Sequence, residues 1–254
     1  MNIRNTAFAA DFDGTLCESD WNLGIERYDP ADLEAVRAYQ AAGGLFGVCT
    51  GRPLVSIVES LKGKLDLDFY IVTTGAQVLD RNLEPLRVRT IDPDVVQALH
   101  ERYAREGVGF IVVTNTQYAC VGYSVGPGVG LLQSLDEVEG PIYDVSLEFA
   151  GDPETARVAC ADVRERFGSR VEAFQNQGSV DIVPAGCSKG TGVQIVREAL
   201  GVERVVGIGD SYNDLPLLEA ADVAYTFHTS PQEVKDAADT VVGSVAEAIA
   251  HLMA

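Results

Sequence analysis

Basic residues are scarce in this sequence. Its 254 residues include 19 Lys and Arg but 38 Asp and Glu, so the formal net charge is -19. Neutralising a nucleic-acid backbone or an anionic membrane requires a broad basic surface, which this composition does not supply, so we expect neither partner. Because the excess negative charge also repels phosphorylated molecules, a phosphate site would have to be built locally from a metal ion, cations and backbone N–H groups.

Cysteine pairs and long apolar segments are also absent. The five cysteines are widely spaced without a C-x-x-C pair, which argues against a zinc site or a redox dithiol and predicts reduced, buried thiols. The three histidines have no spacing typical of a metal site. The apolar segment near the N-terminus ends at Asp11, which makes it too short for a signal peptide or a membrane span. A cytoplasmic protein is expected.

Short apolar stretches alternate with helical patterns in the first part of the chain. Residues 7–10, 45–49 and 69–73 are short, apolar and followed by polar loops, as buried parallel strands are. Between them, Asp29 and the proline after it mark the start of one helix, and residues 54–61 have apolar side chains at helical spacing. This alternation predicts a βαβαβ unit, and therefore an α/β fold with helices on both faces of a Rossmann-like parallel sheet.

The pattern changes between residues 82 and 184, where a helix over 153–167 and strand-like stretches predict a second α/β unit. Apolar strands alternating with helices then resume. We therefore predict a discontinuous core made of residues 1–81 and 185–254, with residues 82–184 inserted in it.

Polar side chains follow three of the predicted core strands. Asp11 and Asp13 follow the first strand, Thr50 the second, and Asp210 and Asp214 a late one. Because the carboxyl ends of parallel strands meet at one edge of a sheet, the four carboxylates are expected to share one pocket. Four like charges at low dielectric require a cation, and an all-oxygen set of ligands favours Mg²⁺.

Potential phosphate donors lie in the same loops. The hydroxyl of Thr50, the N–H of Gly51 and the ammonium of Lys189 can all bind phosphate oxygens. An anion site beside a metal is therefore expected. A carboxylate nucleophile that forms an acyl phosphate would suit this layout, since the metal and the lysine screen its repulsion from the ester.

Four segments in this order resemble the motifs of the haloacid dehalogenase (HAD) superfamily of phosphatases. They are Asp11-Phe12-Asp13-Gly14-Thr15-Leu16, Thr50-Gly51-Arg52, Ser188-Lys189-Gly190 and Gly209-Asp210-Ser211-Tyr212-Asn213-Asp214. The resemblance implies the HAD fold, with Asp11 as nucleophile and Asp13 as general acid and base. It implies that phosphate is held by Thr50, Gly51, Lys189 and Asn213, and Mg²⁺ by Asp11, Asp13, Asp210 and Asp214.

The insertion between the second and third motifs resembles the α/β cap of the Cof-type subfamily, which acts mainly on sugar phosphates and other small phosphorylated metabolites. The resemblance implies a Mg²⁺-dependent phosphatase, a monomer or homodimer, whose cap chooses the substrate. Asp181 and Asn176, near the return of the cap to the core, are candidate contacts. Thr74-Gly75-Ala76 departs from the Ser-Asn-Gly-Ala that this subfamily often carries after its third strand.

Several alternatives stay open. A phosphomutase or a non-catalytic phospho-acceptor module would fit the same motifs, whereas Asp13 argues against a dehalogenase. Arg52 is either catalytic or a structural partner of a carboxylate. Asn213 is a helix N-cap, a phosphate ligand or both.

Overall fold

The structure is a computed structural model that describes residues 3–20, 24–126 and 129–254. Its strands form an eight-stranded sheet, a six-stranded sheet and a small hairpin of β2 (Glu18–Asp20) and β3 (Ile25–Arg27). The eight-stranded sheet has the order β16-β15-β14-β1-β4-β5-β6-β7. In that order its strands are Thr240–Val242, Val223–Phe227, Arg204–Ile208, Thr6–Ala10, Leu45–Cys49, Phe69–Val72, Gln77–Asp80 and Pro85–Val88.

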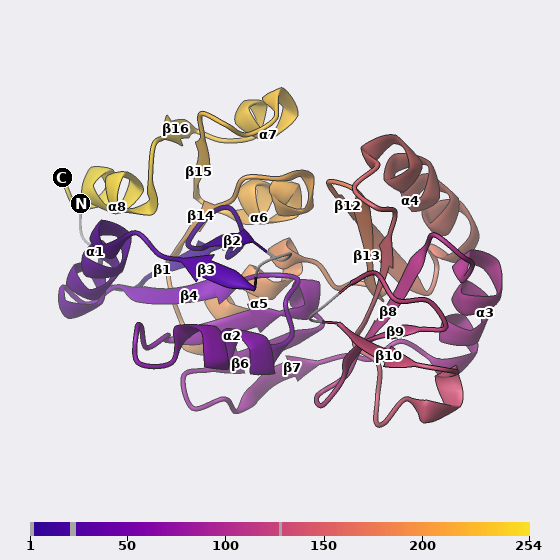
Figure 1. Ribbon diagram of the computed structural model, residues 1–254. Coiled ribbons are helices and arrows are strands. Elements are labelled where there is room, and N and C mark those ends of the chain that lie inside the picture. The colour runs from indigo at the N-terminus through magenta and orange to yellow at the C-terminus, as the bar shows by residue number, and fades with distance from the viewer. Residues whose placement is uncertain (1–2, 21–23, 127–128) are drawn as a thin grey trace.

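The eight-stranded sheet is parallel from β16 to β5 and is covered by helices on both faces (Figure 1). Every residue of β1 is buried, and its side chains alternate between two apolar clusters. Phe8 packs with residues of α1 (Pro30–Ala41), α2 (Leu54–Leu61) and α8 (Val245–Met253). Ala7 and Ala9 pack with residues of α5 (Lys189–Leu200) and α6 (Leu215–Ala220). The short helix α7 (Gln232–Asp236) contacts β15, the second strand of the sheet. The predicted doubly covered parallel sheet is confirmed.

The last two strands of this sheet are antiparallel. Asp80 forms the turn between them, because its Oδ1 accepts hydrogen bonds from the backbone N of Asn82 at 2.8 Å and of Glu84 at 2.9 Å. This turn folds β7 back onto β6. The larger sheet therefore extends to Val88, beyond the boundary between residues 81 and 82 that the sequence pattern suggests.

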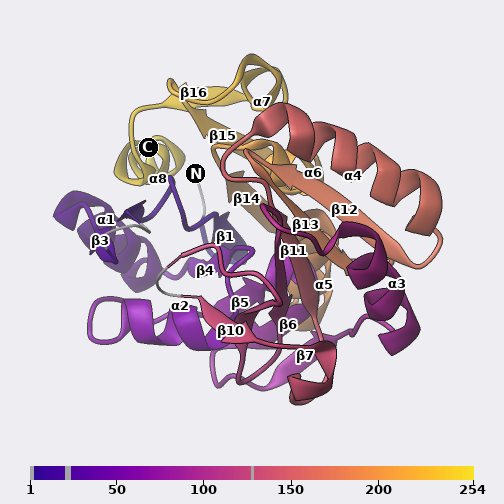
Figure 2. The same cartoon turned by 45° about the vertical axis from the view of Figure 1, so that its right-hand side comes forward.

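The six-stranded sheet has the order β10-β9-β8-β11-β13-β12. Its strands are Gly130–Leu132, Tyr118–Val121, Gly109–Val113, Asp144–Glu148, Ser179–Pro184 and Val171–Asn176. The helices α3 (Pro93–Tyr103) and α4 (Pro153–Phe167) cover one face through a shared apolar cluster, and η2 (Leu135–Glu137) follows β10. Figures 1 and 2 show both helices on the side away from the larger sheet. The opposite face is therefore turned toward the larger sheet.

Two short 3-10 helices of the larger unit meet the six-stranded sheet. η1 (Thr73–Gly75) contacts β13, and η3 (Tyr212–Asp214) contacts β12. Both follow strands of the larger sheet, so the two sheets meet at the carboxyl ends of those strands. All five cysteines are buried free thiols, as predicted. Within the described ranges, no helix combines the length and the apolarity that crossing a membrane would require.

Candidate active site

Asp11 and Asp210 lie side by side at the ends of neighbouring strands. β1 and β14 run in register up to Ala10 and Ile208, and the backbone N of Asp11 still donates to the carbonyl of Ile208 at 2.9 Å. Together with Asp214 they form a group whose carboxylate oxygens lie within 4.8 Å of one another. The predicted convergence of residues some two hundred positions apart is thus confirmed for these three aspartates.

Lys189 sits inside this group. It is the first residue of α5, whose start is fixed by the Ser188 hydroxyl accepting from the backbone N of Thr191 at 3.0 Å. Its fully buried ammonium donates to Asp11 and to Asp214, at 2.5 Å each. Burial opposes the charge on Lys189, but these two carboxylates outweigh it and raise the pKa of Lys189 well above its usual value.

The carboxyl groups of Asp11 and Asp210 have raised pKa values. Burial, followed by the charge of Asp214, raises the pKa of Asp11 well above its usual range and the pKa of Asp210 to about 6. The three carboxylates outnumber the one ammonium, that of Lys189, so the site carries an excess of negative charge. An all-oxygen set with this charge fits Mg²⁺.

Asp214 uses both of its oxygens within the protein. Oδ1 accepts from Lys189, and Oδ2 accepts from the backbone N of Asp210 at 2.9 Å and of Ser211 at 3.0 Å. Asp214 thus holds the lysine and shapes the loop that carries Asp210. Gly14 makes room for that loop, since it has a φ of +81° and a Cβ there would lie 2.8 Å from Oδ2 of Asp210.

Asp13 stands outside the three-carboxylate group. Arg52 donates to both of its oxygens, from Nε at 2.7 Å and from Nη2 at 2.6 Å, in the bidentate geometry that suits a guanidinium. The expected cluster of four carboxylates is therefore wrong for the side chain of Asp13, because this ion pair takes both oxygens. Arg52 is a structural partner of a carboxylate, which was one of the two alternatives for it.

Glu26, from the β2–β3 hairpin, is a neighbour that the sequence did not indicate. Its carboxylate accepts from Arg52 Nη1 at 2.5 Å, from Ser60 at 2.8 Å and from Tyr28 at 2.8 Å. Burial opposes its charge, but these hydrogen bonds outweigh burial and lower the pKa of Glu26. Glu26 has no motif around it, and only the folded hairpin brings it to Arg52.

The loop after β4 is tied to η1. Thr50 is buried, its Oγ1 accepts from the backbone N of Arg52 at 3.1 Å, and its carbonyl accepts from the backbone N of Thr74 at 3.0 Å. Thr73, Thr74 and Gly75 have consecutive φ values of 47°, 50° and 85°. A β-branched residue is strained in this left-handed region, and such strain concentrates at functional sites.

The glycine of η1 allows a close approach to α5. A Cβ on Gly75 would lie 2.2 Å from the carbonyl oxygen of Ser188. η1 therefore packs directly against the start of the helix that carries Lys189. The backbone of η1 therefore contacts both Thr50, through the hydrogen bond of Thr74, and the start of the helix that carries Lys189.

Asn213 is buried in η3, but it caps no helix. Ser211 occupies the N-cap position of η3, and Asp214 that of α6. The helix-cap interpretation of Asn213 is therefore wrong. Its side chain instead lies near the carboxylate of Asp181, a residue of β13.

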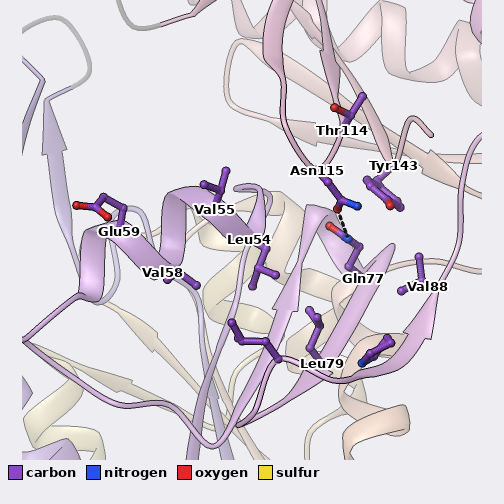
Figure 3. A pocket seen from close by; sticks show the side chains of 12 residues that line it. Leu54, Val55, Val58, Glu59, Gln77, Leu79, Val88, Thr114, Asn115 and Tyr143 are labelled. Carbon is purple, nitrogen blue, oxygen red and sulfur yellow. Dashed lines mark hydrogen bonds between the residues drawn. The ribbon is translucent and has the colours of Figure 1, made fainter. Parts of the chain in front are cut away.

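A groove of about 510 Å³ lies between α2 and the β6–β7 hairpin (Figure 3). At its end Gln77 donates to Asn115 of the smaller unit at 3.1 Å. The other residues that line the groove are mostly apolar, and none of them belongs to the three-carboxylate group. The chemistry described above therefore belongs to the strand ends, not to this groove.

Known proteins resemble this chain over nearly its full length. The stress response protein YhaX of Bacillus subtilis is 37% identical over 268 residues, which cover 96% of this chain and 91% of YhaX. A phosphoglycolate phosphatase of Natronomonas pharaonis is 27% identical over 247 residues, covering 92% of this chain and 89% of that protein. The solved structure of the HAD subclass IIB sugar phosphatase BT4131 has the same fold, with a TM-score of 0.81 and 20% identity over 98% of this chain and 99% of the other. The sequence model of the haloacid dehalogenase-like hydrolases matches residues 8–253, and this chain therefore belongs to the haloacid dehalogenase-like hydrolase family.

Proposed function

We propose that this chain is a Mg²⁺-dependent phosphatase that hydrolyses small phosphate monoesters, sugar phosphates among them, through an aspartyl-phosphate intermediate. The observation that carries the proposal is the buried Lys189 bonded to Asp11 within the three-carboxylate group. A carboxylate held beside a buried ammonium can approach a phosphate dianion, because the ammonium offsets the repulsion. The phosphatase names of one relative and of one structural neighbour support the same substrate class.

Mg²⁺ would be held by Asp11 and Asp210, with Asp214 behind them, and when bound it would neutralise charge on the phosphoryl oxygens. Lys189, Thr50, the N–H of Gly51 and Asn213 would hold the phosphate. In the first step a carboxylate oxygen of Asp11 forms a bond to phosphorus while the bond to the leaving oxygen breaks. Asp13 would give its proton to that oxygen.

In the second step Asp13 would take a proton from water as the water oxygen bonds to phosphorus. The bond between phosphorus and Asp11 then breaks, which releases phosphate and restores the carboxylate. Arg52 would orient Asp13 for both proton transfers. We assign the inserted unit, which contains the six-stranded sheet with α3 and α4, the role of a cap that selects the leaving group and excludes water.

The test is phosphate release from p-nitrophenyl phosphate and a panel of sugar phosphates. Wild type should be active with Mg²⁺ and inactive in excess chelator, and Ca²⁺ should not restore activity, because its larger and looser coordination alters the in-line geometry. Asp11→Asn should abolish release, while Asp136→Asn, at an exposed position of the inserted unit, should not.

Mass spectrometry of the quenched enzyme should find phosphate on the peptide that contains Asp11. Normal turnover by Asp11→Asn would exclude the covalent mechanism. A stable phosphopeptide without phosphate release would instead indicate a phospho-acceptor module.

A further inference from the structure

The face of the six-stranded sheet that looks toward the larger sheet is acidic. Along β11, Val145 and Leu147 belong to the apolar cluster under α3 and α4. Side chains alternate along a strand, so Asp144, Ser146 and Glu148 point to the opposite face. Asp181 of β13 pairs with Ser146 in the register, and its Oδ1 accepts from the Ser146 hydroxyl at 3.5 Å.

Asp181 reaches the proposed phosphate site. A Cβ on Gly51 would lie 3.4 Å from Oδ2 of Asp181 and 3.4 Å from Oγ1 of Thr74. The charge of Lys189 acts on Asp181, although its ammonium is already bonded to two other carboxylates. The space next to Gly51 therefore joins the phosphate loop to the acidic face.

Three buried polar atoms, two of them next to Gly51 and one on Asp144 of the same acidic face, lack a partner. Oδ2 of Asp144, Oδ2 of Asp181 and Oγ1 of Thr74 have no hydrogen bond to any described residue. Asp144 is only 2% exposed and Asp181 only 7%. Leaving carboxylate oxygens buried without a donor costs free energy, so these atoms indicate a ligand that brings hydrogen-bond donors.

The strands of the six-stranded sheet contribute no positive charge to this face. The six strands of this sheet contain no Lys or Arg. Burial, followed by the charge of Asp181, raises the pKa of Glu148 to about 7, and burial raises the pKa of Asp181 to about 6. These raised pKa values mean that the carboxylates are unfavourable in their ionised form without a cation. Sugar hydroxyls would supply hydrogen-bond donors only, whereas an ammonium group would also supply the charge that favours the ionised carboxylates.

A metal ion is a poorer fit than an organic cation. In the described part of the chain, the single group of three side chains close enough to share an ion is that of Asp11, Asp210 and Asp214. The carboxylates of β11 and β13 are spread along the sheet. Such spacing suits a ligand that extends from the phosphate site across the sheet.

We infer that the substrate carries an ammonium group on the part that is released, as in the phosphate monoester of an amino sugar or an amino alcohol, and that Asp181 and Asp144 bind this ammonium. The inference rests on the proposed phosphatase function, because it places the leaving group beside the phosphate site. Such substrates are a subset of the small phosphate monoesters proposed above.

The test compares matched substrates at neutral pH with Mg²⁺. Glucosamine 6-phosphate is paired with glucose 6-phosphate, and phosphoethanolamine with 2-hydroxyethyl phosphate. We expect kcat/KM for the ammonium member of at least one pair to be higher by about tenfold or more, as a charge-assisted hydrogen bond would give. Equal values, or a preference for the hydroxyl member in both pairs, would overturn the inference.

Substitutions test which residues cause the preference for the ammonium substrates. Asp181→Asn and Asp144→Asn should each reduce the ratio of the two kcat/KM values toward one, because the amide keeps the shape and loses the charge. Glu165→Gln, at an exposed position on the outer helix α4, should keep the wild-type ratio. Circular dichroism establishes that each variant is folded. A wild-type ratio in both folded aspartate variants would contradict the assignment.

A binding measurement separates this inference from the proposed function. The shift in melting temperature of the Mg²⁺-loaded protein is recorded with each of the four ligands. If no phosphate is released from any ester, the phosphatase proposal fails. The ammonium site would still be supported if the melting temperature rises more with the ammonium ligands than with their hydroxyl partners, and if Asp181→Asn abolishes this extra rise. Equal shifts within both pairs would overturn that site.

Discussion

Arg52 donates two hydrogen bonds to the carboxylate of Asp13, from Nε to Oδ2 at 2.7 Å and from Nη2 to Oδ1 at 2.6 Å. The same guanidinium bonds Glu26 and lies over the ring of Phe12, 4.6 Å from its centroid. Contacts with Asp13, Glu26 and Phe12 thus fix the position of the Arg52 guanidinium. The orientation of the proposed acid and base thus depends on a residue outside the phosphate and metal sites.

Arg52→Lys should impair proton transfer more than phosphate binding. A lysine ammonium is a point charge and cannot reproduce the two parallel hydrogen bonds to Asp13. We expect kcat for a sugar phosphate to fall by about tenfold or more, and kcat for p-nitrophenyl phosphate to fall less, because p-nitrophenolate leaves without a proton.

Arg157→Lys is the matched control for that change. Arg157 makes a bidentate pair with Glu154 on the surface of α4, at 2.9 and 2.7 Å. Its loss should leave both kcat values unchanged. Equal losses for the two substrates in Arg52→Lys would indicate that Arg52 maintains the site as a whole and does not orient Asp13 in particular.

Lys189→Met should destabilise the protein strongly. It leaves the carboxylates of Asp11 and Asp214 buried without their cation, and breaking a buried ion pair in this way costs about 3–5 kcal/mol. Urea denaturation measures the free energy of unfolding. Lys62→Met removes a lysine whose side chain is 74% exposed, and it should cost no more than about 0.5 kcal/mol.

Mg²⁺ should partly offset the loss in Lys189→Met, since it places a new cation among the same carboxylates. The free energy of unfolding of the variant should therefore rise more with added Mg²⁺ than that of wild type. An identical response of the two proteins to Mg²⁺ would argue against a metal site at Asp11 and Asp210.

Thr74→Asn should stabilise the protein. Thr74 has φ 50° and ψ 37°, and asparagine tolerates this left-handed conformation better than a β-branched residue does. The hydroxyl of Thr74 has no partner that the change would remove. We expect a gain of about 1 kcal/mol in the free energy of unfolding. Thr116→Asn, in an exposed loop without a positive φ, should change the free energy of unfolding little. A lower free energy of unfolding in Thr74→Asn would show that backbone strain is not the dominant effect.

Glu148 should make the protein less stable as pH rises. Burial, followed by the charge of Asp181, raises the pKa of Glu148 from 4.5 to about 7 in the folded state. Between these values the unfolded chain has lost the proton while the folded protein keeps it, so unfolding becomes easier as pH increases. The loss should begin near the unfolded pKa and be complete above the folded one.

Glu148→Gln isolates this effect. The free energy of unfolding of wild type minus that of the variant should fall by about 2 kcal/mol between pH 5 and pH 8 in urea denaturation. Glu165→Gln, at an exposed position on α4, is the matched control and should not reproduce this fall. A flat difference for Glu148→Gln would mean that Glu148 titrates normally.

Much of the fold could be predicted from the sequence. Apolar runs mark β1, β4 and β5 within one residue at each end, because strands buried on both faces carry mostly apolar side chains. Parallel strands present their carboxyl ends at one edge, so the meeting of Asp11 with Asp210 also followed.

The side-chain partners could not be predicted in the same way. The sequence places Asp13 two residues from Asp11, but it does not say that Arg52 would take both oxygens of Asp13 and keep it from the other carboxylates. Glu26 reaches this pair from a hairpin that no motif marks. Ion pairs depend on side-chain direction and distance, and neither is encoded in spacing along the chain.

By itself, the sequence determined the alternation of strands and helices, the insertion, and the residues at the strand ends, because these depend on local periodicity and on the parallel arrangement of strands. Only the tertiary structure decided that Asp181 of β13 lies next to Gly51 of the larger unit, with Asp144 on the same face. That placement depends on how two separately packed sheets meet. Their contact is set by the packing of η1 and η3 against β13 and β12, which no local pattern in the chain specifies.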